Sequence, residues 1–484
     1  MVEEGKPRDE CGVIGIYAPG KKDIARAVYF GLRGLQHRGQ ESAGIAVNRD
    51  GKIKYHKAAG LVQEVFNDEI IEGLRGNIAV GHVRYPAGGE TQVVNAMPLV
   101  IYYKGGALAL AHNGSLVNGR ILREEIQNGG FFFQTTIDAE TIAALIARNM
   151  RVRAMETAFR QDDAGDARGR AMEESILAAL DTIKGAYALV MTTENKLIGA
   201  RDPNGIRPLC LGETKDGFLL SSESCIFSLL EAKMVRDVEP GEMIVIENGA
   251  VRPHIFAKDR PRTGCSFEYV YLARPDSDID KRNVYMARGA CGRKLAKEAP
   301  VSADMVISVP DSGTVAAIGY AEEAGIPYGE GFIKNRYVGR SFIEPDQRTR
   351  ELAVRLKLNV IANNVEGKRI IIVDDSIIRG TTSMKIVSML REAGATEVHM
   401  RIASPPVTHR CFYGIDTPDE GQLVASVKNP KEISDMIGTD SLAFLSLAGM
   451  MEAIALGNQV CAACFDGKYP TELPESDLKW EEGS

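Results

Sequence analysis

The 484-residue sequence lacks the features that mark secreted, membrane-spanning and nucleic-acid-coating proteins. Its eight cysteines are too few and too scattered for a disulfide scaffold, which favours a reducing, cytoplasmic compartment. No apolar run reaches the roughly 18–20 residues that span a bilayer, because the most apolar long stretch, 442–457, contains Ser446 and Glu452. The start MVEEGKPRDE has neither the basic nor the apolar region of a secretory signal. A net charge of −7 argues against a nucleic-acid partner or a basic membrane-surface protein.

What is present is a globular composition, and the chain is long enough for two or three domains. The first half reads as short strands between glycine-rich turns, with helices predicted over 138–155 and 172–183 and a surface loop over 161–170. This pattern predicts a layered α/β domain with mostly antiparallel sheets.

The second half begins near 261–264 and alternates near-continuous apolar strands with amphipathic helices. Strands are predicted over 305–309, 369–375 and 398–404, and helices over 314–325 and 382–394. This alternation is typical of a parallel, doubly wound sheet. The polar residues after Cys464 are predicted to form a surface tail.

Several residues of the first half suit amide chemistry. Cys11 opens an apolar strand, although a lone cysteine is most simply a buried core residue. Arg84 ends a strand and could hold a carboxylate through two hydrogen bonds. Asn113 and Gly114 end another strand and offer a side-chain amide and a backbone N–H to an oxyanion. Asp138 starts a helix and could pair with an ammonium group or simply cap that helix.

Over about 11–250, the segments CGVIGI, LQHRGQESAGI, GHVRY, AHNGSLVN, TTIDAET and RDPNGIRPL resemble the N-terminal-nucleophile glutaminases of the glutamine amidotransferases. The resemblance implies an αββα-layered domain and a propeptide, 1–10, whose removal makes Cys11 the nucleophile and its α-amino group the general base. It implies that Arg84 holds the glutamine carboxylate and Asp138 the glutamine ammonium, while Asn113 and Gly114 form the oxyanion hole. The segment 86–90 departs from the family's usual pattern and lacks a threonine that normally lines the glutamine pocket.

A second motif follows the predicted strand 369–375, which ends in Asp374 and Asp375. Adjacent acids usually mark a solvated turn, but here the hydroxyl-rich loop SIIRGTTS follows and opens a helix. Backbone N–H groups at a helix start can cradle a phosphate, and the two acids could hold ribose hydroxyls and, through water, Mg²⁺. The sequence has no G-x-x-x-x-G-K-S/T, which excludes a Walker-type nucleotide site.

This strand and loop resemble the motif of type I phosphoribosyltransferases that binds PRPP, 5-phosphoribosyl 1-diphosphate. The resemblance implies one Mg²⁺ per chain, held by Ser312, Asp374 and Asp375. It also implies that the basic segment 334–350, which alone could be a solvated loop, closes over the diphosphate. The residues that the resemblance assigns to PRPP are Lys334, Arg336, Lys357, Asp374, Asp375, Ser376, Arg379, Gly380, Thr381 and Thr382.

Cys461 and Cys464 form a C-x-x-C pair, which alone could bind zinc or an iron–sulfur cluster or be redox-active. With Cys265 in CSFEYVYLARPDS and Cys411 in HRCFYGID, the pair resembles the [4Fe–4S] ligands of the Bacillus-like, cluster-bearing branch of the amidophosphoribosyltransferases. The resemblance implies one structural cluster per chain that holds the C-terminal segment 446–484 to both domains. Structural zinc is the alternative metal. The remaining cysteines, Cys210, Cys225 and Cys291, are predicted to be core residues.

Nearly the whole chain, about 11–475, resembles the amidophosphoribosyltransferase family. The resemblance implies a two-domain α/β protein, with an N-terminal-nucleophile glutaminase domain at 11–250 and a type I phosphoribosyltransferase domain at 262–445. It implies that PRPP, glutamine and water give 5-phosphoribosylamine, diphosphate and glutamate, the first committed step of purine synthesis. It further implies an internal ammonia channel, inhibition by purine nucleotides, and a homotetramer or homodimer.

Three other functions share part of this pattern. Glucosamine-6-phosphate synthase has the same glutaminase half, but here the second half carries the PRPP loop instead of isomerase domains. A PRPP-sensing regulator would not need the glutaminase residues, all of which are present. An iron–sulfur sensor would have an activity unrelated to glutamine. Release of glutamate and diphosphate, measured together with and without PRPP, separates these functions.

Overall fold

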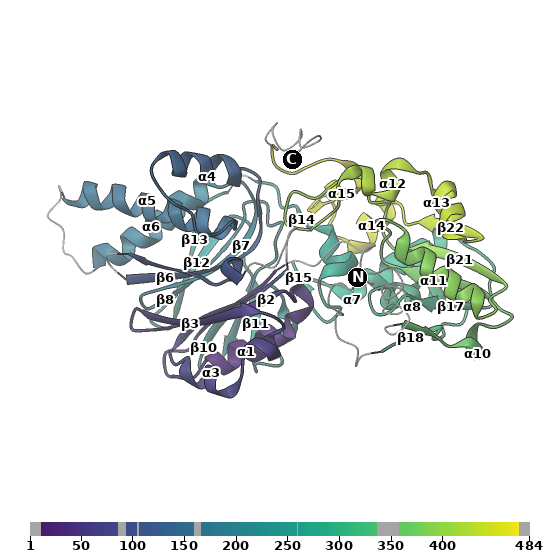
Figure 1. Ribbon diagram of the computed structural model, residues 1–484, viewed down its shortest axis with the longest axis horizontal. Helices are drawn as coiled ribbons and strands as arrows, with labels where there is room; N and C mark the ends of the chain where they lie inside the picture. Colours follow the sequence, from purple (N-terminus) through teal and green to yellow (C-terminus); the bar gives the residue numbers. More distant parts are fainter. Residues whose placement is uncertain are drawn as a thin grey trace.

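The structure is a computed structural model that describes residues 11–85, 93–103, 106–158, 166–258, 260–335 and 358–473, with side chains described except at 153–158 and 166–170. It has two lobes, and Figure 1 shows the strands β1 to β13 on the left and the strands β17 to β22 on the right. No helix in the described ranges is long and apolar enough to cross a membrane.

The first lobe is built on two stacked antiparallel sheets. In spatial order, the seven-stranded sheet contains β11 (Lys233–Asp237), β9 (Cys210–Thr214), β10 (Gly217–Ser221), β1 (Gly12–Tyr17), β4 (Ile78–Arg84), β2 (Ser42–Arg49) and β3 (Lys52–Ala59). The six-stranded sheet contains β13 (Ala250–Ile255), β12 (Glu242–Glu247), β8 (Lys196–Arg201), β7 (Gly185–Thr193), β6 (Gly106–Leu116) and β5 (Leu99–Tyr103).

Helices cover the outer face of each sheet, so the lobe has four layers (Figure 1). The six-stranded sheet is covered by α4 (Gly119–Asn128), α5 (Asp138–Ala158) and α6 (Asp166–Thr182), and the seven-stranded sheet by α1 (Ala25–Gly34), α2 (Val62–Val65) and α3 (Asp68–Gly73). Alternate residues of β1 face opposite layers. Val13 and Tyr17 pack between the sheets, while Ile14 packs in the cluster formed with α1. This is the αββα arrangement that the sequence predicts.

The second lobe is built on a parallel sheet with the strand order β17 (Met305–Ser308), β20 (Arg369–Asp374), β21 (Glu397–Ile402) and β22 (Ser441–Phe444). One face packs in a hydrophobic cluster with α7 (Val284–Glu298), α8 (Thr314–Ala324) and α14 (Leu447–Ile454), and the other face with α11 (Thr381–Glu392) and α13 (Pro430–Ile437). Ile371 and Val373 of β20 face the first group, whereas Ile370 and Ile372 face the second. Burial on both faces explains why this strand is apolar throughout.

Short elements complete the second lobe and the junction. They are β15 (Asp278–Ile279), β16 (Arg282–Asn283), β18 (Phe332–Lys334), β19 (Leu358–Val360), α10 (Ala362–Val365), α12 (Val424–Val427) and the π-helical turn η4 (Glu268–Leu272). At the junction, β14 (Gly264–Cys265) pairs in parallel with β23 (Val460–Cys461), which α15 (Ala463–Asp466) follows. The core of the second lobe takes in Val117, Ala186 and Ile206 of the first lobe, so the lobes share buried apolar surface.

Two expectations for local structure are wrong in part. The loop predicted over 161–170 already includes the start of α6 at Asp166, because the alanine and arginine residues around Gly169 favour a helix strongly enough to include one glycine. The chain after Cys464 is also more than a surface tail. Phe465 stacks on Phe267 with ring centroids 6.0 Å apart, and the Tyr469 hydroxyl donates to Arg410 O at 2.7 Å. Aromatic rings among the polar residues bind this segment to the lobe.

Candidate functional site

A cavity of about 500 Å³ lies where the two lobes meet, and its lining includes all five residues assigned to glutamine chemistry, namely Cys11, Arg84, Asn113, Gly114 and Asp138. The sheet register explains part of this convergence. Gly12 of β1 pairs with Val83 of β4, which places Cys11 beside Arg84 at one sheet end. The end of β6 and the start of α5 supply the other three residues from the second sheet and its covering layer.

Asn113 is the residue whose surroundings most need explanation. Its side chain is fully buried and lines the cavity, yet among the described residues neither the amide nitrogen nor the amide oxygen has a hydrogen-bond partner. Buried polar groups are nearly always satisfied, and an exception at a cavity points to a ligand. The neighbouring Gly114 has a φ of +130°, and a Cβ there would lie 2.1 Å from Ala186 O. Only glycine fits at this position.

Asp138 is the first residue of α5, and its carboxylate accepts a hydrogen bond from Leu116 N at 2.8 Å. This bond joins it to the end of β6 and not to the first turn of its own helix, so the alternative of a simple helix cap does not apply. Burial raises the pKa of Asp138 to about 6, although hydrogen bonds from Leu116 and Ser115 favour the charged form. A half-buried carboxylate at a cavity wall suits a ligand ammonium group.

Arg84 is held by a neighbouring acid. Its guanidinium donates from Nη1 to Glu41 Oε2 at 3.0 Å. A guanidinium has five N–H donors, so this pair orients Arg84 and leaves others for a ligand carboxylate. The altered segment 86–90 and the propeptide 1–10 lie outside the described residues.

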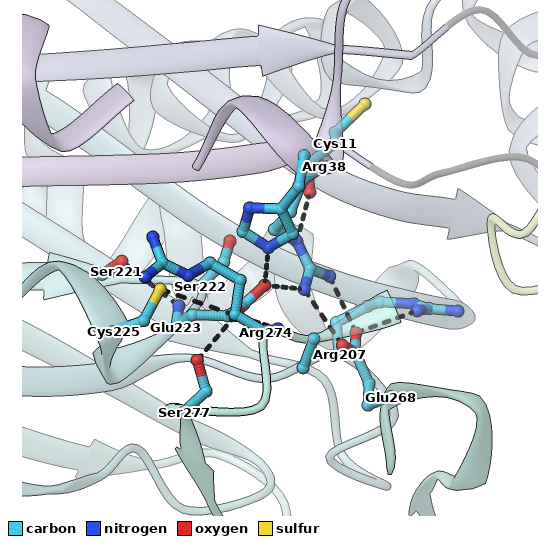
Figure 2. Close-up of polar contacts among 12 residues, drawn as sticks. Cys11, Arg38, Arg207, Ser221, Ser222, Glu223, Cys225, Glu268, Arg274 and Ser277 are labelled. Atoms are coloured by element: carbon cyan, nitrogen blue, oxygen red, sulfur yellow. Dashed lines mark hydrogen bonds and ion pairs between the residues drawn. The ribbon is translucent and has the colours of Figure 1, made fainter. Parts of the chain in front are cut away.

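Beneath Cys11 lies a buried ion network that the sequence reasoning missed (Figure 2). Arg38 donates from Nε to Cys11 O at 3.2 Å and pairs with two carboxylates, Glu223 at 2.6 Å and Glu268 at 2.7 Å. Arg207 of the first lobe also forms an ion pair with Glu268, with its Nη1 3.6 Å from Oε1. The motif LQHRGQ contains Arg38, but its partners stand 185 and 230 residues away in the sequence, so local pattern gives no signal for them.

The second lobe places the PRPP motif as the sequence predicts, at the carboxyl end of β20 and the start of α11. Asp374, Asp375 and Ser376 are buried, and the Ser376 hydroxyl donates to Asp375 Oδ1 at 2.6 Å. Gly380 precedes α11 with a φ of +77°, and Thr381 and Thr382 form the first turn of that helix. The first backbone N–H groups of any helix have no acceptor within that helix. In α11 these N–H groups belong to the turn that begins at Thr381.

The loop 309–313 approaches the two acids closely. A Cβ on Gly313 would lie 2.6 Å from Val373 O and 3.1 Å from Asp374 Cα, so only glycine permits this approach. Ser312 and Asp375 line the same small cavity, together with Arg288 of α7, which the sequence reasoning missed. Burial lowers the pKa of Arg288, and the negative charge of Asp375 opposes that shift.

Two cations assigned to PRPP already have partners. Lys334 of β18 forms an ion pair with Asp311 at 2.9 Å, which brings β18 to the loop 309–313. Arg379 donates to Gln422 Oε1 at 2.9 Å. Arg336 and Lys357 lie outside the described residues.

The four cysteines assigned to a cluster line one small cavity at the junction. Three separate segments bring them there. Cys265 on β14 stands opposite Cys461 on β23, Cys464 lies in α15, and Cys411 comes from the segment between β21 and α12. None of the chain's eight cysteines, all within the described ranges, forms a disulfide. Burial raises the pKa of Cys461 to about 12, and burial with the other three cysteines raises that of Cys464 well above its usual value. Cys210, Cys225 and Cys291 are buried in hydrophobic clusters, as predicted.

The spacing of these four thiols bears on which group they fit. Within the part of the chain that the structure describes, no three or more His, Cys, Asp or Glu side chains lie close enough to hold one metal ion. The cysteines instead surround a cavity, and Tyr413 N donates to Cys411 Sγ at 3.3 Å. Four thiols around one cavity, with a backbone N–H on one sulfur, have the ligand number and ligand type of a [4Fe–4S] cluster.

Comparison with known proteins covers both lobes. Residues 92–228 match the family profile of a glutamine amidotransferase domain. The chain is 48% identical over 476 residues to the amidophosphoribosyltransferase of Synechococcus elongatus, which covers 97% of this chain and 93% of that protein.

Two solved structures extend the likeness to the whole fold. The glutamine PRPP amidotransferase of Bacillus subtilis in complex with ADP and GMP has a TM-score of 0.87 at 46% identity, covering 96% of this chain and 98% of that one. A structure of the allosteric regulatory enzyme of purine biosynthesis has a TM-score of 0.88 at 46% identity, covering 96% of this chain and 97% of that one.

Proposed function

The chain belongs to the amidophosphoribosyltransferase family, and we propose how its residues divide the reaction between two sites. The enzyme transfers the amide nitrogen of glutamine to PRPP, the first step of purine biosynthesis. In our proposal the cavity around Cys11 releases ammonia from glutamine, and the motif at Asp374 and Asp375 binds PRPP. The observation that carries this division is the buried amide of Asn113 on the wall of the Cys11 cavity, which has no hydrogen-bond partner within the described ranges.

In the first site, we propose that Arg84 binds the α-carboxylate of glutamine and Asp138 its α-ammonium. In this proposed pose the side-chain amide carbon faces Cys11, which lines the same cavity. The Cys11 sulfur attacks that carbon, while the α-amino group of Cys11, freed by removal of 1–10, takes the thiol proton. An α-amino group with a pKa near 7.7–8.0 is suited to this exchange at neutral pH.

Asn113 and Gly114 then stabilise the oxyanion of the tetrahedral intermediate. The α-amino group returns its proton to the nitrogen, the carbon–nitrogen bond breaks, and ammonia leaves behind a thioester. Water hydrolyses the thioester to glutamate and restores Cys11. Because the Asn113 amide has no partner among the residues that the structure describes, it donates to the oxyanion without first breaking a hydrogen bond to any of them.

In the second site, we propose that the start of α11, with Gly380, Thr381 and Thr382, binds the 5-phosphate of PRPP through backbone N–H and hydroxyl groups. Asp374 and Asp375 hold the ribose hydroxyls. Ammonia attacks C1 of the ribose and diphosphate leaves, with Lys334 beside the loop 309–313 to bind the leaving group.

We propose that one Mg²⁺ binds here together with PRPP. Ser312 and Asp375 line one cavity, and Gly313 brings their loop against Asp374. Mg²⁺ favours one or two carboxylates with substrate phosphates over an all-protein cage, which suits the pair of Asp374 and Asp375. When bound, Mg²⁺ would supply positive charge beside the diphosphate of PRPP.

We also propose one [4Fe–4S] cluster per chain on Cys265, Cys411, Cys461 and Cys464. The support is the cavity that the four thiols surround, their origin in three chain segments, and the Tyr413 N–H donated to Cys411. A bound cluster supplies a cross-link between the lobe junction and the C-terminal segment. The thiols would be reduced in the cytoplasm, where we place the enzyme.

ADP and GMP accompany the B. subtilis relative, and we propose that purine nucleotides inhibit this enzyme too. We also propose that the enzyme assembles as a homotetramer or a homodimer.

The test of the division between sites is Cys11→Ala. We expect it to abolish the glutamine-dependent reaction and to leave the reaction with added ammonium salt near the wild-type rate, because PRPP binds elsewhere. Mass spectrometry of active enzyme should show a chain that begins at Cys11. Loss of both reactions in a folded variant, or full activity with Met1 on every chain, contradicts the proposal.

A further inference from the structure

One wall of the glutamine cavity comes from the second lobe. Arg410, Cys411, Phe412, Gly414, Ile415, Asp416 and Thr417 line the cavity together with the residues of the first lobe. Cys411 and Ile415 also line the cavity of the four cysteines, so this turn separates the two cavities. Within this segment only Cys411 has a role predicted from the sequence. The other lining residues of the segment take no part in the proposed mechanism.

Gly414 of this turn lies directly on Gly114. A Cβ on Gly414 would lie 3.1 Å from both Cα and C of Gly114 and 3.5 Å from Ser115 N. Distances near 3.1 Å are shorter than a carbon–carbon contact at its optimum of about 3.5–4.0 Å, so an added methyl group would press on Gly114. Gly414 also has a φ of +116°, a region that favours glycine.

The main chain of β7 also lies close to Gly114. A Cβ on Gly114 would lie 2.1 Å from Ala186 O and 2.8 Å from Ala186 C, so the backbone of β7 closes that face. Main chain from both lobes therefore packs against Gly114.

Two hydrogen bonds hold the turn that carries Gly414 in place. The backbone oxygen of the buried Tyr413 accepts a hydrogen bond from Arg207 Nε at 3.0 Å. Cys411 N donates to Thr417 Oγ1 at 2.8 Å, which closes the turn across its base. These bonds give the turn little freedom to retreat from an added methyl group.

We propose that Gly414 is a positioning residue for the oxyanion hole. It packs on Gly114 and holds it against β7. Because Gly414 has no side chain, the main chain of Gly114 keeps its position at the cavity. This inference rests on the proposed role of Asn113 and Gly114 in binding the oxyanion. Oxyanion donors act only when they are held close to the position that the charge takes up, so a shift of a few tenths of an ångström matters.

The test is Gly414→Ala, with Gly457→Ala as the matched control. Gly457 also has a positive φ, +58°, but has nothing within 4 Å of its Cβ position, so its variant reports strain without contact. We expect Gly414→Ala to lower kcat for glutamine about tenfold or more, in line with the cost of misplacing reacting groups. The KM for glutamine, the ammonia-dependent rate and the iron content should stay near wild type, because Arg84, Asp138, the PRPP site and the cysteines do not move. Gly457→Ala should match wild type in all four measurements.

Two outcomes overturn the inference: an unchanged kcat for glutamine, or a parallel loss of both reactions and of iron, which would assign Gly414 a structural role only. Asn113→Ala in the same assay separates this from failure of the proposed function. If Asn113→Ala lowers kcat for glutamine and Gly414→Ala does not, the positioning role alone is wrong. If Asn113→Ala has no effect, the oxyanion hole itself is wrong, and with it the inference.

Discussion

Arg38 of the first lobe and Glu268 of the second form a buried pair with two hydrogen bonds, Nη2 to Oε1 at 2.7 Å and Nη1 to Oε2 at 3.0 Å. Both side chains are only 1% exposed. The same guanidinium donates from Nε to Cys11 O, so the main chain of the nucleophile is tied directly to the other lobe (Figure 2). The position of Cys11 therefore depends on how the lobes are joined.

Glu268→Gln should damage the glutamine site more than the PRPP site. The amide keeps the shape but removes the charge that Arg38 and Arg207 share, and we expect the free energy of unfolding to fall by about 1–3 kcal/mol. We expect kcat for glutamine to fall as well, because Arg38 loosens its hold on Cys11 O. Denaturant unfolding and the two rate assays measure both effects.

The control for that variant is Asp304→Asn, which removes a charge from an exposed pair with Arg369. Exposed ion pairs contribute about 0–1 kcal/mol, so this variant should leave stability and both rates near wild type. Equal effects of the two substitutions would show that burial of the Arg38 network has no special role.

Asp138 should make glutamine turnover sensitive to acid. Burial raises its pKa to about 6, and only the carboxylate form can pair with the glutamine ammonium. We expect kcat/KM for glutamine to fall more steeply below about pH 6 than protonation of the Cys11 α-amino group alone would cause, because Asp138 of the free enzyme then also becomes neutral. The ammonia-dependent reaction should lack this acid limb, since it does not use Asp138. An identical acid limb in both reactions would assign the titration elsewhere.

Asp138 should also lower stability at neutral pH. Its folded-state pKa, about 6, lies above the usual value of 3.8, so the folded state binds more protons between those values and stability falls as the pH rises through them. We expect Asp138→Asn to unfold at a higher temperature than wild type at pH 8 and to lose glutamine binding. The difference in melting temperature should shrink at pH 4, where both side chains are neutral in the folded state. A lower melting temperature for the variant at pH 8 would contradict this sign.

Asp374→Asn and Asp375→Asn, alone or together, should impair the glutamine-dependent and the ammonia-dependent reactions alike, because both reactions need PRPP and Mg²⁺. Glutamine hydrolysis without PRPP should persist in these variants. Near-wild-type ammonia-dependent rates in the double variant would remove these residues from the site.

Enzyme purified without oxygen should be brown and contain about four irons per chain. Serine at Cys265, Cys411, Cys461 or Cys464 should lower iron content and stability, whereas serine at the core residues Cys210, Cys225 or Cys291 should leave iron content unchanged. Air should bleach and inactivate the enzyme together, with loss of activity following unfolding. A colourless, fully active preparation with one zinc per chain would decide for the zinc alternative.

The sequence predicts well what local pattern controls. Apolar periodicity locates β1, β4, β6, β20, α8 and α11, and motif resemblance selects the five residues that line the glutamine cavity. The start of α6 at Asp166 could not be predicted from the sequence, because glycine and mixed charge are also typical of a loop.

Contacts between the lobes could not be predicted in this way. Arg38 meets Glu268 across 230 positions of sequence, and Gly414 meets Gly114 from the other lobe. Neither contact leaves a periodic or spacing signal in either segment, since each depends on how two finished lobes pack. The inter-lobe wall of the glutamine cavity therefore becomes visible only in the folded chain.

In this enzyme, we propose, one chain couples glutamine hydrolysis to phosphoribosyl transfer. The most direct test of this coupling is to quantify glutamate and diphosphate together after mixing the enzyme with glutamine, PRPP and Mg²⁺. We predict that the two products form in equal amounts and that diphosphate release requires either glutamine or added ammonium salt. Glutamate released in the presence of PRPP with no matching diphosphate, or diphosphate released with neither nitrogen source, would contradict the account.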